Sequence, residues 1–143
     1  LPEIFSDIKK IDFTARALIV WNKNRLIPSR GHYHWKHEPC LYAVRNNEKS
    51  DWCGNRKQET VWDIDVVKND TEHSTQKPIE CMARPIRNHS GDVYDPFIGS
   101  GTTLVAGAQL GRRVFGMEVS PEYVQVTLDR MKKLYPDIEI KKL

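Results

Sequence analysis

The sequence predicts an α/β protein with a doubly wound, mostly parallel sheet, and three observations support that prediction. Residues 91–135 follow the order strand, glycine loop, helix, strand, acidic residue, helix, which is typical of a βαβα unit. The run ALIVW at 17–21 is apolar without alternation and predicts a strand inside a parallel sheet, covered on both faces. Segments 32–36 and 40–45, separated by a proline, predict an antiparallel pair or two edge strands.

The N-terminal and central elements follow from local signals. Residues 2–10 have an early acid, late lysines and apolar residues at helical spacing, which favours a short helix. Residues 46–70 are polar and weakly periodic, so we expect an insertion or long loop with one short strand near 61–66.

The C-terminal elements have clearer boundaries. Proline suits the first helical turn, so Lys77-Pro78 predicts a helix over 78–88, which Pro85 limits or kinks. The elements that follow are a strand, a helix ended by glycine, a strand and a helix stopped by proline, predicted over 91–94, 102–110, 113–118 and 120–135.

Composition predicts a single soluble, cytoplasmic domain. The 143 residues are 39% hydrophobic and 29% charged, and no apolar run approaches the roughly 18 residues of a membrane-spanning helix. The three cysteines are far apart and form no CxxC pair, which is typical of reduced thiols rather than zinc or redox sites. A net charge of +3 permits nucleic-acid binding without requiring it. Because the first residue is Leu1, we expect a trimmed chain or a fragment.

The glycine loop DPFIGSGTT at 95–103 is the strongest candidate for a ligand site. Ligands of doubly wound sheets bind at the carboxyl ends of strands, so this loop and Glu118 should face one crevice. A carboxylate at that position suits a ribose diol. Leu104 replaces the third glycine of the dinucleotide fingerprint, and no lysine follows as in a P-loop. A nucleoside-containing cofactor is therefore predicted, ahead of a nicotinamide cofactor or a turn without a ligand.

Three motifs, in the order in which they occur along the chain, resemble those of a known enzyme family. DPFIGSGTT, GMEVSPEYV and the upstream HSTQKPIE resemble the cofactor half of the S-adenosylmethionine-dependent amino methyltransferases that modify adenine N6 or cytosine N4 in DNA. IVWNK and HEPCLYAVR resemble later motifs of the catalytic half, in the order of a permuted subgroup whose cofactor loop comes last. The resemblance implies a Rossmann-like methyltransferase domain over 1–143, with part of the catalytic half at 1–45, a short target-recognition insertion at 46–72 and the cofactor half at 73–143.

The resemblance also implies which residues hold S-adenosylmethionine. Glu118 matches the ribose ligand. The segment that wraps the methionine part of the cofactor is matched by Asp95, Phe97, Gly99, Ser100, Gly101, Thr102 and Thr103. The segment that reaches the cofactor's amino acid end is matched by Thr75, Gln76 and Lys77, although by themselves these residues would suit a helix cap with a solvated lysine.

The family's catalytic motif, [DNS]PP[YFW], does not occur in the sequence. The one Asp-Pro pair belongs to the glycine loop, and no Pro-Pro pair exists. The resemblance places the motif before Leu1, on a strand between that of 17–21 and the one that ends at Asp95. We therefore assign no catalytic residue here and expect a preceding segment or a partner chain to carry the motif. The expected function is site-specific DNA methylation in a bacterial or phage restriction-modification setting, with adenine N6 favoured. This chain alone is expected to be inactive, and the alternative is a non-catalytic nucleic-acid-binding remnant.

The segment KNRLIPSRGHYHWK at 23–36 is the candidate DNA contact. It carries four Lys/Arg and no acid, interleaved with aromatic residues, which suits phosphates with exposed bases. A solvated loop beside a core tryptophan explains the composition equally well, and the resemblance favours double-stranded DNA with a flipped target base. The expected contacts are Lys23, Arg25, Arg30, Tyr33, Trp35 and Lys36. The order HxxHE at 34–38 does not match known zinc helices, so no metal is predicted. A homodimer would supplement the short recognition region.

Overall fold

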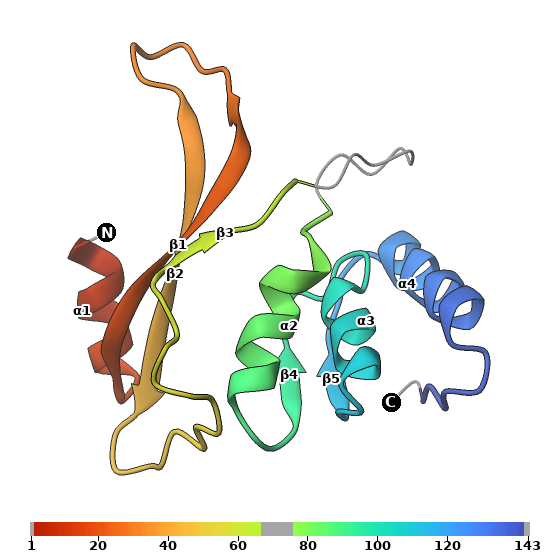
Figure 1. Cartoon of the computed structure of the whole chain (residues 1–143). Coiled ribbons are helices and arrows are strands. Elements are labelled where there is room, and N and C mark those ends of the chain that lie inside the picture. Colours follow the sequence, from red (N-terminus) through yellow and green to blue (C-terminus); the bar gives the residue numbers. More distant parts are fainter. Residues whose placement is uncertain (1, 67–75, 142–143) are drawn as a thin grey trace. The chain divides into compact units, whose positions relative to one another are not determined.

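The protein is described from a computed structural model that covers residues 2–66 and 76–141 (Figure 1). The chain divides into two compact units, residues 1–66 and 67–143, and each is described by itself. None of the helices in the described ranges is long and apolar enough to cross a membrane.

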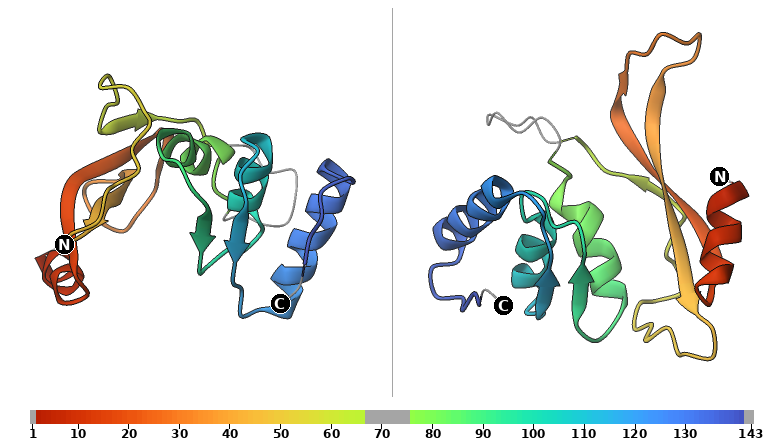
Figure 2. Two further views of the ribbon diagram at one scale, coloured as in Figure 1. Left: turned by 90° about the horizontal axis from the view of Figure 1, so that it is seen from below. Right: turned by 180° about the vertical axis from the view of Figure 1, so that it is seen from behind.

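The first unit is a helix followed by a mixed three-stranded sheet. Helix α1 (Pro2–Lys10) precedes β1 (Phe13–Ile27), β2 (Trp35–Arg45) and β3 (Val61–Asp63). Strand β1 is central, antiparallel to β2 and parallel to β3. β1 and β2 form a long twisted hairpin (Figures 1 and 2). The predicted helix at 2–10 and the short strand near 61–66 are therefore confirmed.

Two strand predictions in the first unit need correction. The run at 17–21 is part of a 15-residue strand whose length follows from pairing with β2, and Leu18 is 39% exposed, so the run is not covered on both faces. The segment 32–45 does not form two strands, because β2 continues through Pro39, which lies opposite Val20. β2 is an edge strand of this sheet, where a proline without an N–H donor is tolerated.

The strand expected between that of 17–21 and the one that ends at Asp95 would carry the catalytic motif, and its presence stays a prediction. The described first unit limits where such a strand could pair. Within the described first unit, both edges of β1 are already occupied, one by β2 and the other by β3. Any strand added to this sheet must therefore pair with β2 or β3, since a strand has only two hydrogen-bonding edges.

The second unit contains the parallel part of the fold. Its elements are α2 (Ile79–Asn88), β4 (Val93–Asp95), α3 (Thr102–Gln109), β5 (Val114–Gly116) and α4 (Pro121–Leu134). β4 and β5 pair in parallel, and α2 and α3 lie side by side (Figures 1 and 2). All five predicted elements are confirmed, with the strands shorter than expected. Together with the first unit they confirm the predicted α/β class.

Local signals explain the helix boundaries of the second unit. Pro78 is the N-cap residue of α2, which continues through Pro85 to Asn88. Helix α4 begins after Ser120, whose hydroxyl accepts from the Tyr123 N–H.

The core of the second unit lies between α2 and α3. It is formed by Ala83, Ile86 and Ala106, with Val93 of β4 packed against them. Helix α3 also lies very close to β5, because a Cβ atom at Gly107 would be 2.2 Å from a methyl carbon of Val114. The small side chains therefore allow the helix to approach the sheet closely and bring its first turn to the carboxyl end of β4.

Candidate functional site

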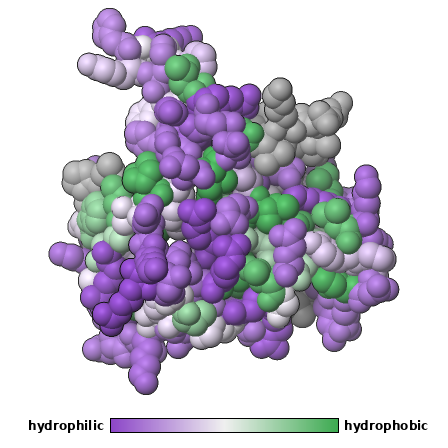
Figure 3. Space-filling model, viewed as in Figure 1, coloured by the Kyte–Doolittle hydropathy of each residue, from purple (hydrophilic) through white to green (hydrophobic). Residues whose placement is uncertain are grey.

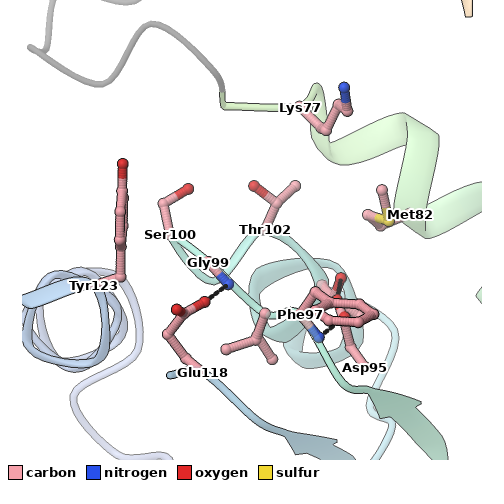
Figure 4. A pocket seen from close by; sticks show the side chains of 11 residues that line it. Lys77, Met82, Asp95, Phe97, Gly99, Ser100, Thr102, Glu118 and Tyr123 are labelled. Atoms are coloured by element: carbon pink, nitrogen blue, oxygen red, sulfur yellow. Dashed lines mark hydrogen bonds between the residues drawn. The ribbon is translucent and has the colours of Figure 1, made fainter. Parts of the chain in front are cut away.

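A hollow of about 320 Å³ lies over the glycine loop in the second unit (Figure 4), a size within the range of small-molecule sites. It opens where β4 and β5 end, as expected for a doubly wound sheet. Its lining includes eight of the residues predicted to hold the cofactor: Lys77, Asp95, Phe97, Gly99, Ser100, Thr102, Thr103 and Glu118. Thr75 lies outside the described residues.

Three lining residues were not predicted from the sequence. Met82 comes from α2, Ile98 from the loop and Tyr123 from the first turn of α4. Ile98 is buried against Gly116 of β5. Tyr123 lies three residues after the N-cap of α4, so a helix start next to the strand-end acid was the signal available for it.

Asp95 organises the loop around itself. One carboxylate oxygen accepts from the backbone N–H of Phe97 at 2.9 Å, and the other accepts from the Thr103 hydroxyl at 2.5 Å. The Asp95 carbonyl accepts from the Met117 N–H at 2.9 Å, which connects the ends of the two strands. Thr103 is buried. Asp95 therefore joins the end of β4 to the first turn of α3 and sets the shape of the hollow's floor.

Glu118 connects the two loops that follow the parallel strands. Its Oε2 accepts from the Gly99 N–H at 2.9 Å (Figure 4). Its Oε1 accepts from the Ser120 N–H at 2.9 Å. Each carboxylate oxygen has about two acceptor positions, so each keeps one for a ligand. The side chain is only half-buried. Glu118 is thus a fixed, accessible double acceptor of the kind that a diol requires.

Only glycine suits position 101, because of its backbone conformation and because of the side chain packed against it. Its φ of +80° lies in the left-handed region, at the N-cap position of α3. A Cβ atom there would also lie 2.8 Å from Cγ2 of Thr127, which is closer than real Cβ contacts. Gly101 is buried beneath the loop, so it shapes the site without lining it.

Polar groups face the hollow from several sides. In Figure 4 the hydroxyls of Ser100, Thr102 and Tyr123 point to the same side of the loop, and Lys77 and Glu118 lie on opposite sides of the hollow. Phe97 also lines the hollow and is 86% exposed. The arrangement offers a carboxylate at one end and an ammonium group at the other, as a ligand with a diol and a distant carboxylate would need.

The residues predicted to contact DNA belong to the first unit. Five of them are exposed: Arg25, Arg30, Tyr33, Trp35 and Lys36. The end of the hairpin that carries Arg30 and Tyr33 is coloured mostly hydrophilic at the top of Figure 3. Tyr33 is 93% exposed, as an aromatic that stacks on a base would have to be.

Lys23 differs from the other predicted DNA contacts. Its side chain is 6% exposed, and its ammonium lies 2.6 Å from the Glu38 carboxylate. The ammonium also lies 5.0 Å from the ring centroid of Trp21. A buried, paired ammonium is not available to a phosphate without breaking that pair, so the structure places Lys23 inside the hairpin rather than on its surface.

Comparisons with known proteins agree with this geometry. A family model described as DNA methylase, of the N6 and N4 type, matches residues 1–129. The type II methyltransferase M.HinfI of Haemophilus influenzae is 28% identical over 159 residues, covering 93% of this chain and 44% of the relative. M.Cfr9I of Citrobacter freundii is 35% identical over 134 residues, covering 82% of this chain and 44% of the relative.

A solved structure is similar over most of the chain. The crystal structure of the M1.HpyAVI–SAM complex superposes with a TM-score of 0.76 at 29% identity, covering 90% of this chain and 68% of that one. The chain spans about half the length of the relatives it matches in sequence.

Proposed function

The chain belongs to the DNA methylase family of N6 and N4 amino methyltransferases, and from this premise we propose that its protein transfers a methyl group from S-adenosylmethionine to an exocyclic amino group of a DNA base. Adenine N6 is the favoured target. The observation that carries the proposal is the hollow at the glycine loop, with Glu118 and Lys77 on opposite sides of it.

The hollow suits the two ends of this cofactor. The free acceptor positions of Glu118 would bind the ribose diol, and the Lys77 ammonium would attract the carboxylate of the methionine part. Between them the loop of Gly99 and Ser100 approaches the ligand closely, since its backbone lines the hollow. Thr75 and Gln76 belong to the same proposed set at the amino acid end.

S-adenosylmethionine supplies an activated methyl group on its sulfonium, and the amine must approach that methyl in line. The described residues bind and orient the cofactor, which contributes proximity. The sequence contains no [DNS]PP[YFW] motif to hold the target amine. In our proposal that motif lies on another segment of the same protein or on a partner chain.

The exposed end of the β1–β2 hairpin is proposed to contact double-stranded DNA around a flipped base. Its three cationic side chains, Arg25, Arg30 and Lys36, would bind phosphates, and Tyr33 and Trp35 offer rings for stacking. Lys23 is left out because it is buried against Glu38. The polar region 46–72 would take part in target recognition, in a monomer or a homodimer.

Calorimetric titration of the full-length protein with S-adenosylmethionine tests the cofactor site. Glu118→Gln should weaken binding, because a hydrogen bond to a charged group contributes about 1.5–3 kcal/mol, or roughly a ten- to hundredfold change in Kd. Glu122→Gln removes an exposed carboxylate of α4 outside the hollow and should leave Kd unchanged. A folded protein that does not bind, or equal affinity in the two variants, would refute the proposed site.

Methyl transfer to DNA distinguishes an enzyme from a remnant. The second candidate function is a non-catalytic nucleic-acid-binding remnant of such an enzyme. Transfer of labelled methyl groups to duplex DNA, followed by nucleoside separation, would establish an enzyme and identify adenine or cytosine as its target. Cofactor and DNA binding without transfer by the full-length protein would establish the remnant.

A further inference from the structure

Two side chains of α4 hold the glycine loop without lining the hollow. The Thr127 hydroxyl donates to the Gly99 carbonyl at 2.7 Å, and Nη1 of Arg130 donates to the Ser100 carbonyl at 2.9 Å. Residues three apart share a helix face, so both act from one side of α4. Thr127 is 4% exposed. The carbonyls of two consecutive loop residues are thus bound by one helix that lies 28 to 30 residues further along the chain.

Arg130 has a further partner in the segment before α2. With the Gln76 amide oriented so that its oxygen faces the guanidinium, that oxygen lies 2.7 Å from Nη2 and 3.3 Å from Nη1. The opposite orientation would place N–H donors of both groups against each other, because a guanidinium has no acceptor. Arg130 therefore selects the amide orientation in which the Gln76 oxygen faces the guanidinium and the NH₂ group points away from it.

The charge of Arg130 has no carboxylate partner in the part of the chain that the structure describes. Within the described ranges, no carboxylate lies within 4.0 Å of its guanidinium. Burial lowers the pKa of this guanidinium from its usual range, but an arginine side chain stays protonated in proteins. The half-buried guanidinium of Arg130 thus binds three oxygens, those of the Ser100 carbonyl, the Thr102 hydroxyl and the Gln76 amide. Gln76 belongs to the segment that also carries Lys77.

We infer that Arg130 is a positioning residue for the amino acid end of the cofactor. It holds Gln76 with the amide NH₂ free to donate to the cofactor's carboxylate, and at the same time it fixes the Ser100 carbonyl beside that end. A wrongly oriented amide would present its oxygen to the carboxylate and repel it. The inference rests on the proposed function of the hollow and adds a residue that does not touch the ligand.

Two ligands separate this role from a general structural one. S-adenosylhomocysteine carries the amino acid carboxylate, whereas 5′-methylthioadenosine shares the adenosine and thioether but lacks that end. In the full-length protein, Arg130→Met should raise the Kd of S-adenosylhomocysteine roughly tenfold, which corresponds to the loss of about one charge-assisted hydrogen bond. The Kd of 5′-methylthioadenosine should stay within about twofold of its wild-type value. Arg130→Lys should show most of the same loss, because lysine lacks the planar fork.

Thr127→Val and Gln76→Leu provide the matched comparisons. Thr127→Val removes the hydrogen bond to the carbonyl of Gly99, the residue whose N–H binds Glu118. Because both ligands carry the ribose that Glu118 is proposed to bind, this variant should weaken the binding of both by the same factor. Gln76→Leu should reproduce the selective loss, and adding Arg130→Met to it should change the ratio of the two affinities little, because Arg130 acts through Gln76.

Each other outcome overturns the inference. Equal losses for both ligands in Arg130→Met would indicate a structural role, and full rescue by Arg130→Lys would indicate a charge effect without orientation of Gln76. Additive effects of the two substitutions would show that Arg130 does not act through the amide. If the wild-type protein binds both ligands with equal affinity, the inference that the amino acid end is recognised is refuted, whereas the proposed cofactor site is not. One that binds neither refutes the proposed cofactor site, and the inference with it.

Discussion

Alanine at Gly101 should destabilise the second unit more than alanine at Gly111, although both glycines have positive φ. The angles are +80° and +62°, so both substitutions carry the backbone cost of a left-handed residue, which is about 1–2 kcal/mol. At Gly111 a Cβ atom would meet nothing within 4 Å. At Gly101 it would lie 2.8 Å from Cγ2 and 3.0 Å from Oγ1 of buried Thr127.

The steric contact sets the difference between the two variants. Overpacking of this kind costs about 1–3 kcal/mol, which brings the expected loss for Gly101→Ala to roughly 2–5 kcal/mol. Thr127→Ser removes the nearest methyl carbon and keeps the hydroxyl that binds the Gly99 carbonyl. Adding it to Gly101→Ala should therefore recover about 1 kcal/mol or more.

Urea unfolding followed by far-ultraviolet circular dichroism measures these free energies. Three of the four described helices, α2, α3 and α4, belong to the second unit, so the helical signal reports mainly on it. All four tryptophans lie in residues 1–66, so their fluorescence reports on the first unit and should be unaffected. Equal losses for the two alanine variants, or no recovery by Thr127→Ser, would refute the steric reasoning.

Two further predictions concern stability. Trp21→Phe should lower the free energy of unfolding by about 1–3 kcal/mol, because Nε1 of this buried residue donates to the Ile64 carbonyl at 2.7 Å. An unchanged urea midpoint in the fluorescence of the remaining tryptophans would contradict it. Glu80 has a pKa lowered mainly by its hydrogen bond to Arg87, so its stabilisation is present above the ordinary glutamate pKa and is lost as the pH falls through the lowered value. Glu80→Gln should flatten this acid dependence by less than about 1 kcal/mol, since both side chains of the pair are partly exposed. Urea unfolding of the wild type and the variant across the acid range measures this difference, and identical pH profiles would contradict it.

The candidate site was largely predictable because its groups are close in sequence or at strand ends. The glycine loop, Glu118 and Lys77 were all expected at one crevice, and all line the hollow. Their roles as cofactor ligands stay predictions. Thr127 and Arg130 were not expected, since a polar pair three apart on a helix is common and carries no signal of what lies opposite.

By itself the sequence determined the order of elements, the helix boundaries and the family. Capping residues, prolines and glycines act on their own neighbourhood, so Ser120 and Pro78 marked helix starts without any knowledge of the fold. Only the tertiary structure decided which surfaces meet. The central position of β1, the burial of Lys23 and the hold of Arg130 on the glycine loop depend on contacts between residues 8 to 54 positions apart. Such contacts follow from packing, which no local pattern of residue types encodes.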